Sequence, residues 1–433
     1  MEFTYDDFLA HYYGKSSMKP IMPLEPWKCV DYSRFPHKEG EIERNTQKTL
    51  KALGLRMGGE YFERFKRVQA LSQEYGKRVF PAYDFLFLDV VCEDWLSLVD
   101  FHKDFRRDHS VHQPLTAYIV CKILGGGKTA DAFFIGGQSL LDKALDVIIN
   151  AAEAQYLRDR LKVYDSTTQL LKGNRDLWRL VFYQTAIITA MYHDLGYPWQ
   201  FIEQMHSYLK DDIMLPGRLR YDKSVVNPQV KEYIENHKNE LMFRPFYNYG
   251  KGGLTTDSIN DKLFEQFLHE SHGVPGALAY WLYNDEYNKT STEPTLGLIK
   301  FCQEWSSLAI LMHDMQKAYA QAGSGFARLD FRTDPLSFII ALADTLEDFN
   351  RPNALFYIDD KTPKGCRIEY CFPSLSVELE ENAGVAELRY KIIENEKTSQ
   401  EFYKNEDQIK LFGEQGFFDL SSVGLSSMSV KCY

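Results

Sequence analysis

Apolar residues recur with a period near 3.6 over about residues 85–350, where runs of alternating polar and apolar residues are few. This spacing gathers apolar side chains on one face of a helix, so it predicts a largely helical body. The pattern changes after residue 352, and segment 366–392 alternates polar and apolar residues between turn signals, which predicts two or three strands. We therefore expect a mainly α protein with a small C-terminal β-containing appendage.

These changes of pattern divide the 433 residues into three predicted parts. Residues 1–85 combine a proline-punctuated arm with a first helical segment, 86–355 form the helical core, and 356–433 form a β-rich accessory segment with a tail. We expect the arm to be irregular or to contact a partner protein. The last residues, 419–433, are expected to be flexible or bound to a partner.

Charge and cysteine usage exclude several classes of protein. A net charge of −11 argues against direct nucleic-acid binding, which needs a basic surface. Seven scattered cysteines without a CxxC pair predict reduced thiols in a cytoplasmic protein. The sequence has no apolar run of membrane-spanning length, and its first residues do not have the pattern of a secretory signal. We therefore expect no association with a membrane.

The stretch MYHDLGYP (191–198) places a charged group where a buried helix is expected to end. The apolar run FYQTAIITAMY leads directly into His193 and Asp194, and a Gly-Tyr-Pro breaker follows. Burying an unpaired carboxylate is costly, so Asp194 is expected to have a partner.

Four further segments place metal-ligand residue types on faces expected to point inward. They contain His112 on an amphipathic helix, His272 just ahead of a helix start at Pro275, His313 after an apolar run, and Asp344 inside FIIALAD. Alone, an inward histidine is more often a hydrogen-bonded core residue, and an inward aspartate can pair with a buried arginine. Four histidines and two aspartates together favour one shared partner. Imidazole and carboxylate suit divalent ions such as Mn, Fe, Zn, Co or Ni, so the sequence predicts a metal site.

The order of these residues, H…HD…H…H…D, resembles that of the HD-domain superfamily of metal-dependent phosphohydrolases, in its dinuclear branch. The resemblance covers roughly residues 100–352 and is carried by RDHSVHQPLTAY, MYHDLGYP and FIIALADTLEDFNRP. It implies a helical HD-domain core. The Gly-Tyr-Pro here directly follows the HD doublet, unlike the motif of HD-GYP proteins, so cyclic di-GMP is not inferred as a ligand.

The resemblance implies which residues bind each of two metal ions. One ion would be held by His112, His193, Asp194 and Asp344, and Asp194 would bridge to a second ion held by His272 and His313. Two ions from the set Mn, Fe, Co, Ni and Zn are expected, with Mg possible in part.

Residues outside the ligand set are expected to complete catalysis. His109 is a candidate acid for the leaving oxygen, although its spacing of three residues from His112 differs from the four found in the cyclic-nucleotide phosphodiesterase branch. A role beside the ligands or on the surface is the alternative for His109. Substrate phosphates are expected to be held by some of the flanking cations, which are otherwise solvated charges: Arg106, Arg107, Lys317 and Arg351.

A nucleotide phosphohydrolase is the activity that the resemblance implies. A deoxynucleoside triphosphate triphosphohydrolase is favoured, because large multi-helix HD proteins with an added C-terminal segment resemble that branch. Alternatives are a cyclic nucleotide or oligonucleotide phosphodiesterase, an HD-type dinuclear-iron oxygenase with the same ligand order, and a nucleotide-sensing protein without catalysis. A homo-oligomer, or a complex with a partner protein through the N-terminal arm or C-terminal segment, is also expected.

Overall fold

The structure is a computed structural model, and it describes a defined part of the chain. The described residues are 1–4, 7, 109–164, 169–197, 199, 228–247, 264, 267–269, 271–290, 296–315, 328–347, 353–358, 366–371, 374–392, 410–413 and 416–432.

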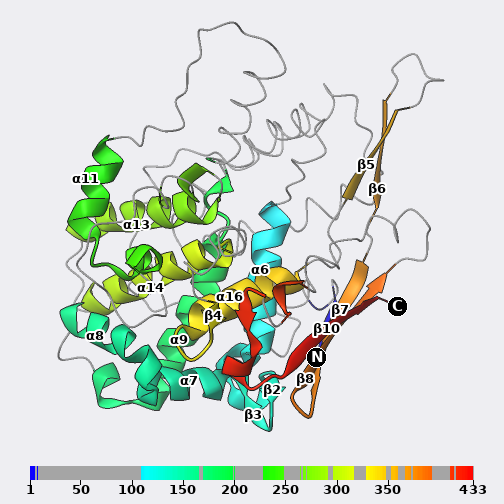
Figure 1. Cartoon of the computed structure of the whole chain (residues 1–433), viewed down its shortest axis with the longest axis horizontal. Helices are drawn as coiled ribbons and strands as arrows, with labels where there is room; N and C mark the ends of the chain where they lie inside the picture. The colour runs from blue at the N-terminus through cyan, green and yellow to red at the C-terminus, as the bar shows by residue number, and fades with distance from the viewer. Residues whose placement is uncertain are drawn as a thin grey trace, which may run out of the picture.

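The protein is mainly α, as the apolar period predicts, with a smaller β portion (Figure 1). The described α-helices are α6 (His109–Ile123), α7 (Leu140–Asn150), α8 (Gln155–Tyr164), α9 (Arg175–Tyr192), α11 (Pro228–His237), α13 (Gly273–Thr290), α14 (Leu296–His313) and α16 (Pro335–Leu346). The described strands are β1 (Glu2–Thr4), β2 (Phe134–Ile135), β3 (Gln138–Ser139), β4 (Leu329–Asp330), β5 (Asn353–Ile358), β6 (Cys366–Cys371), β7 (Ser374–Asn382), β8 (Val385–Ile392), β9 (Phe418–Asp419) and β10 (Ser427–Cys432).

Two helices lie at the centre of the helical body. Every residue of α9 from Val181 to Tyr192 is buried, and so is every residue of α14 from Phe301 to His313. A helix that is buried all round must be surrounded by other elements. α9 packs against α6 and α14, and α14 also packs against α13 and α16. The residues at the C-terminal ends of these two helices therefore lie inside the protein: His193 and Asp194 after α9, and His313 and Asp314 at the end of α14, are all buried.

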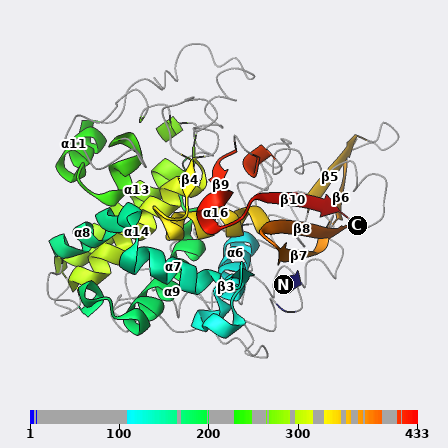
Figure 2. The same cartoon turned by 60° about the horizontal axis from the view of Figure 1, so that its bottom comes forward.

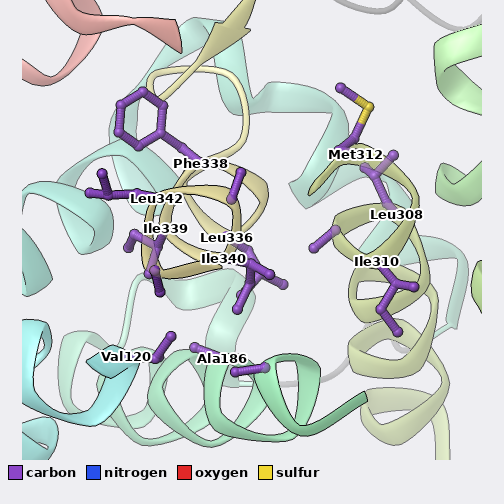
Figure 3. Packing of buried hydrophobic residues seen from close by; sticks show 14 of the residues in the cluster. Val120, Ala186, Leu308, Ile310, Met312, Leu336, Phe338, Ile339, Ile340 and Leu342 are labelled. Carbon is purple, nitrogen blue, oxygen red and sulfur yellow. The ribbon is translucent and has the colours of Figure 1, made fainter. Parts of the chain in front are cut away.

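Capping residues fix where the helices around this centre begin. The side chain of Asn174 accepts a hydrogen bond from the backbone N–H of Leu177 at the start of α9. Asp334 caps α16 by accepting from the N–H of Ser337, and Pro335 occupies the first turn, as the sequence predicts. The apolar side chains of α16 then pack between α6, α9 and α14 (Figure 3).

A four-stranded sheet with the order β1-β7-β8-β10 lies beside the helices (Figure 2). β7 and β8 form an antiparallel hairpin, which confirms strands in segment 366–392 together with β6. The inner face of the sheet joins the helical core through Val377, Leu379, Leu388 and Tyr390, all at most 1% exposed. The tyrosine hydroxyl also donates a hydrogen bond to the carbonyl oxygen of Thr345 in α16.

Both ends of the described chain belong to this sheet. β1 pairs antiparallel with β7, and β10 pairs parallel with β8. The tail expected at 419–433 is not flexible at residues 427–432, because these residues pair with β8, and its binding to a partner remains a prediction. The irregular arm expected for the first residues is also not found at residues 2–4, which form a strand. The remainder of the arm, except residues 1 and 7, lies outside the described residues.

The division into three parts remains a prediction. The boundary at 85/86 lies outside the described residues, and the boundary at 355/356 falls inside β5. Among the helices that the structure describes, none has the length and apolar character needed to cross a membrane.

Candidate metal centre

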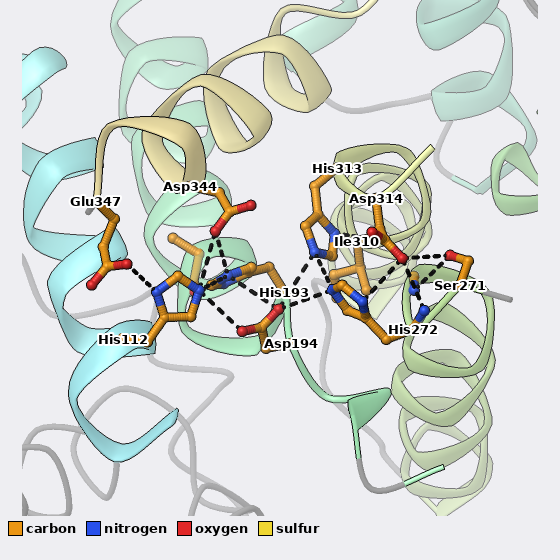
Figure 4. Close-up of polar contacts among 12 residues, drawn as sticks. His112, His193, Asp194, Ser271, His272, Ile310, His313, Asp314, Asp344 and Glu347 are labelled. Atoms are coloured by element: carbon orange, nitrogen blue, oxygen red, sulfur yellow. Dashed lines mark hydrogen bonds and ion pairs between the residues drawn. The ribbon is translucent and has the colours of Figure 1, made fainter. Parts of the chain in front are cut away.

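Five separate segments bring the predicted ligands together in one cluster, in which every ligand is buried except Asp344, whose side chain is 29% exposed (Figure 4). The contributing positions are the first half of α6 for His112, the turn after α9 for His193 and Asp194, the residue before α13 for His272, the last residue of α14 for His313, and the C-terminal half of α16 for Asp344. α9 and α14 are buried helices that end at this cluster. A charged or polar ligand therefore directly follows an apolar run in the sequence.

The first half of the cluster contains His112, His193, Asp194 and Asp344. The Nε2 atom of His112 lies 3.0 Å from Nε2 of His193, 3.0 Å from Oδ2 of Asp194 and 3.1 Å from Oδ1 of Asp344. His193 Nε2 lies 3.4 Å from Oδ1 atoms of both aspartates. Metal–ligand bonds of about 2.1 Å give neighbouring donors about 3.0 Å apart in an octahedron and about 3.4 Å apart in a tetrahedron. These four side chains fit around one ion.

The second half contains His272 and His313, and Asp194 joins it to the first. The Nε2 atoms of the two histidines lie 3.0 Å apart. Asp194 Oδ1 lies 3.2 Å from Nε2 of His272 and 3.5 Å from Nε2 of His313, while its Oδ2 contacts His112. Oδ1 therefore faces His193 as well as the second pair of histidines, and Oδ2 faces His112, so the carboxylate lies between the two halves as a bridging ligand would.

Hydrogen bonds at Nδ1 aim all four imidazoles. Backbone carbonyl oxygens three residues earlier accept from two of the rings, His193 to Ala190 at 2.7 Å and His313 to Ile310 at 2.5 Å. Carboxylates lie at Nδ1 of the other two rings, Glu347 at 2.5 Å from His112 and Asp314 at 3.0 Å from His272.

Because carbonyls and carboxylates accept hydrogen bonds, each Nδ1 carries the hydrogen and each neutral ring presents a lone pair at Nε2. Two lone pairs 3.0 Å apart repel unless a cation or a proton lies between them. This arrangement, in which Nδ1 is held by an acceptor and Nε2 faces the cluster, is that of metal-binding histidine.

Charges in the cluster also favour a cation. Burial acts to raise the pKa of Asp344, but the facing imidazoles of His112 and His193 hold that pKa well below its usual range. Burial lowers the pKa of His193. Burial opposes protonation of His272 as well, yet Asp314 and Asp194 together raise the pKa of His272 to about 9. Around neutral pH the cluster therefore contains ionised carboxylates and binds a proton where a metal ion can replace it.

A close backbone contact sets the position of the second half. A Cβ atom built on Gly196, two residues after Asp194, would lie only 1.8 Å from the carbonyl oxygen of His272 and 2.6 Å from the N atom of Gly276. Glycine at 196 therefore lets the turn after α9 touch the start of α13. The ring of Tyr197 stacks on the ring of His272, with centroids 3.9 Å apart and an interplanar angle of 16°.

The structure brings together all six predicted ligands, but it does not describe the other predicted site residues. His109 is the first residue of α6, and its side chain lies outside the described part. The four predicted phosphate-binding cations lie entirely outside the described residues: Arg106, Arg107, Lys317 and Arg351. Their roles remain predictions.

Two carboxylates of the site are missing from the sequence prediction. Glu347 lies one helical turn after Asp344, and Asp314 directly follows His313 to make a second His-Asp doublet. Both signals are visible in the sequence, but their contacts with His112 and His272 depend on the packing of different helices.

Comparisons of the chain with protein-family models, curated proteins and solved structures find no match. The chemistry of the cluster is therefore inferred from its own residues.

Proposed function

We propose that this protein is a metal-dependent phosphohydrolase of the HD type that acts on a nucleotide, with a deoxynucleoside triphosphate as the favoured substrate. The observation that carries the proposal is the convergence of four aimed imidazoles and two aspartates in one buried cluster, with Asp194 between two histidine pairs. The residue order that resembles the HD superfamily supplies the reaction class.

Two divalent transition-metal ions fit the residues present. His112, His193, Asp194 and Asp344 would hold the first ion, and Asp194, His272 and His313 would hold the second. The carboxylates of the cluster and of its Nδ1 partners contribute up to four negative charges, which two divalent ions would balance: Asp194, Asp344, Asp314 and Glu347. When bound, such a pair supplies Lewis acidity that activates a water molecule and polarises a phosphoryl oxygen.

The two halves differ in the number of protein donors. The first half has four side chains and the second has three, since Asp344 Oδ1 lies 3.1 Å from His112 and 3.4 Å from His193, whereas its nearness to His313 is only within 4.8 Å. Fewer protein ligands leave more coordination positions for water or substrate, as in catalytic metal sites generally. We therefore propose that a substrate phosphate binds on the side of His272 and His313.

The described residues have three tasks in this proposal. Asp194 holds the two halves together, the carbonyls of Ala190 and Ile310 orient two of the rings, and the buried ends of α9 and α14 shield the cluster from bulk water on all but the Asp344 side. Preorganised groups in a water-excluded site stabilise developing charge more strongly than the same groups in water.

The proposal is tested by incubating the purified protein with a panel of nucleotides under strict anaerobiosis, with Mn²⁺ or with chelator, and identifying the products. The panel contains deoxynucleoside triphosphates, ribonucleoside triphosphates and cyclic mono- and oligonucleotides. Asp194→Ala is the inactive control, and Gly136→Ala, in the remote turn between β2 and β3, is the control for substitution itself.

Manganese-dependent release of triphosphate from deoxynucleoside triphosphates without oxygen is the expected result. Cleavage of cyclic nucleotides alone would indicate that the protein is a phosphodiesterase. Turnover that requires iron and oxygen would indicate that the protein is an oxygenase and not a hydrolase. Tight nucleotide binding without turnover would favour the sensing protein.

A further inference from the structure

Two buried carboxylates contact the Nδ1 side of histidines whose Nε2 atoms face the cluster, one in each half. Glu347 is fully buried and Asp314 is 7% exposed. The carboxylate of Glu347 contacts Nδ1 of His112, and that of Asp314 contacts Nδ1 of His272 (Figure 4). Neither carboxylate belongs to the ligand set, and both touch the side of the imidazole that faces away from the cluster centre.

The contacts of Asp314 are concentrated on one oxygen. Its Oδ2 accepts hydrogen bonds from the hydroxyl of Ser271 at 2.7 Å and from the backbone N–H of His272 at 2.9 Å, and it lies 3.0 Å from Nδ1 of the same histidine. Contact with both the backbone and the ring of His272 leaves that side chain little freedom to rotate. Three donors converge on this one oxygen, which is the environment that stabilises an ionised carboxylate.

Comparison of the two His-Asp doublets shows that their aspartates have different tasks. His193 and His313 stand at the ends of α9 and α14, and each donates from Nδ1 to the carbonyl three residues earlier. Asp194 turns toward the Nε2 atoms, whereas Asp314 turns to Nδ1 of His272. In each half of the cluster, Nδ1 of one histidine therefore contacts a backbone carbonyl and Nδ1 of the other contacts a carboxylate.

We propose that Asp314 and Glu347 are positioning residues that set metal affinity separately in the two halves: Asp314 through His272, and Glu347 through His112. The proposal rests on the proposed metal binding. A carboxylate at Nδ1 fixes the tautomer and orientation of the imidazole and increases electron donation from Nε2 to an ion. A neutral acceptor at the same place keeps the orientation and loses the second effect.

Metal-binding titrations of Asp314→Asn and Glu347→Gln test this division. Both substitutions keep an oxygen that can accept the Nδ1 hydrogen bond and remove the negative charge. Metal-free protein is titrated with Co²⁺ against a competing chelator, and the two binding phases are followed by visible absorption. Each variant is expected to weaken one phase by about 10- to 100-fold, the range for changes behind a metal ligand, and to leave the other near its wild-type value.

A His272→Ala background assigns each phase to its half. The single ion that this variant retains is expected to be bound in the first half. Adding Glu347→Gln should lower the affinity for that ion by the same factor as in the wild-type background. Adding Asp314→Asn should leave that affinity unchanged. Ser271→Ala removes one hydrogen bond to Asp314 and the acceptor of the Gly273 N–H without removing charge, so it is expected to give a smaller shift in the second half only. It serves as the readout if Asp314→Asn does not fold.

The outcomes separate this inference from the proposed function. Two ions in the wild-type protein, with both phases unchanged in the charge-removing variants, would overturn the inference and leave metal binding intact. Equal weakening of both phases by either variant would also overturn it, since the carboxylates would then act on the whole cluster. A wild-type protein that binds no ion would overturn both proposals.

Discussion

Gly196→Ala tests whether the contact between the turn after α9 and the start of α13 builds the second half of the site. The new Cβ would lie 1.8 Å from the carbonyl oxygen of His272, and ordinary contact begins at 3.4 Å, so the backbones must separate by about 1.6 Å. Metal sites tolerate changes in ligand distance of only about 0.2 Å. Asp194 Oδ1 and His272 Nε2, now 3.2 Å apart, would no longer reach one ion.

We expect Gly196→Ala to retain one ion per chain instead of two and to lose nucleotide turnover. Overpacking of this kind destabilises proteins by about 1–3 kcal/mol, so the free energy of unfolding measured in urea should fall by that amount. Gly136→Ala is the matched control: it stands at a φ of +58° with no atom within 4 Å of the added Cβ. Backbone strain of about 1–2 kcal/mol is expected there with both ions retained. Two ions bound with wild-type affinity in Gly196→Ala would refute the reasoning.

Three further predictions concern the ligands themselves. Replacing His272 or His313 by alanine should reduce metal content from about two ions to about one per chain by elemental analysis, and retention of both ions in both variants would remove these histidines from the ligand set. His193→Ala should abolish turnover while circular dichroism stays close to that of the wild type, because the ring contacts only other members of the cluster and a nearby carbonyl among the described hydrogen bonds. Lowering the pH from 9 to 6 should release the ion on the His272 side first. Burial lowers the pKa of His272, but Asp314 and Asp194 outweigh it and raise that pKa to about 9, so below pH 9 a proton competes with the ion for Nε2, by about tenfold per pH unit. Burial lowers the pKa of His193, so proton competition at that ring is weaker. Metal content measured after gel filtration at each pH checks the order, and simultaneous loss of both ions would contradict it.

The helical elements and the six candidate ligands follow from local patterns in the sequence, and the structure brings those candidates together. The capping of α16 by Asp334 and Pro335 is a local property, and the structure confirms it. The apolar run that leads into His193 predicts that the second part of α9, Val181 to Tyr192, is buried on all sides. Such features depend on neighbours in the sequence, so spacing and residue type are sufficient to predict them.

Other features depend on contacts between distant segments. The strand at 427–432 alternates Met428, Val430 and Cys432 with polar residues, but its order comes from parallel pairing with β8, which no local pattern specifies. Asp314 belongs to a His-Asp doublet like that of Asp194, yet only the packing of α13 against α14 turns it behind His272. The need for glycine at 196 likewise arises from a backbone nearly 80 residues away in the sequence.

Metal content tests the central claim most directly, namely that six converging side chains hold a pair of divalent ions. Wild-type protein and Asp194→Ala are stripped with chelator, reloaded with Mn²⁺, separated from free ions and measured by elemental analysis per folded chain. About two ions per wild-type chain and fewer than one per Asp194→Ala chain are expected, because Asp194 contacts both pairs of histidines. No bound ion in the wild-type protein, or equal metal content in both proteins, would contradict the account.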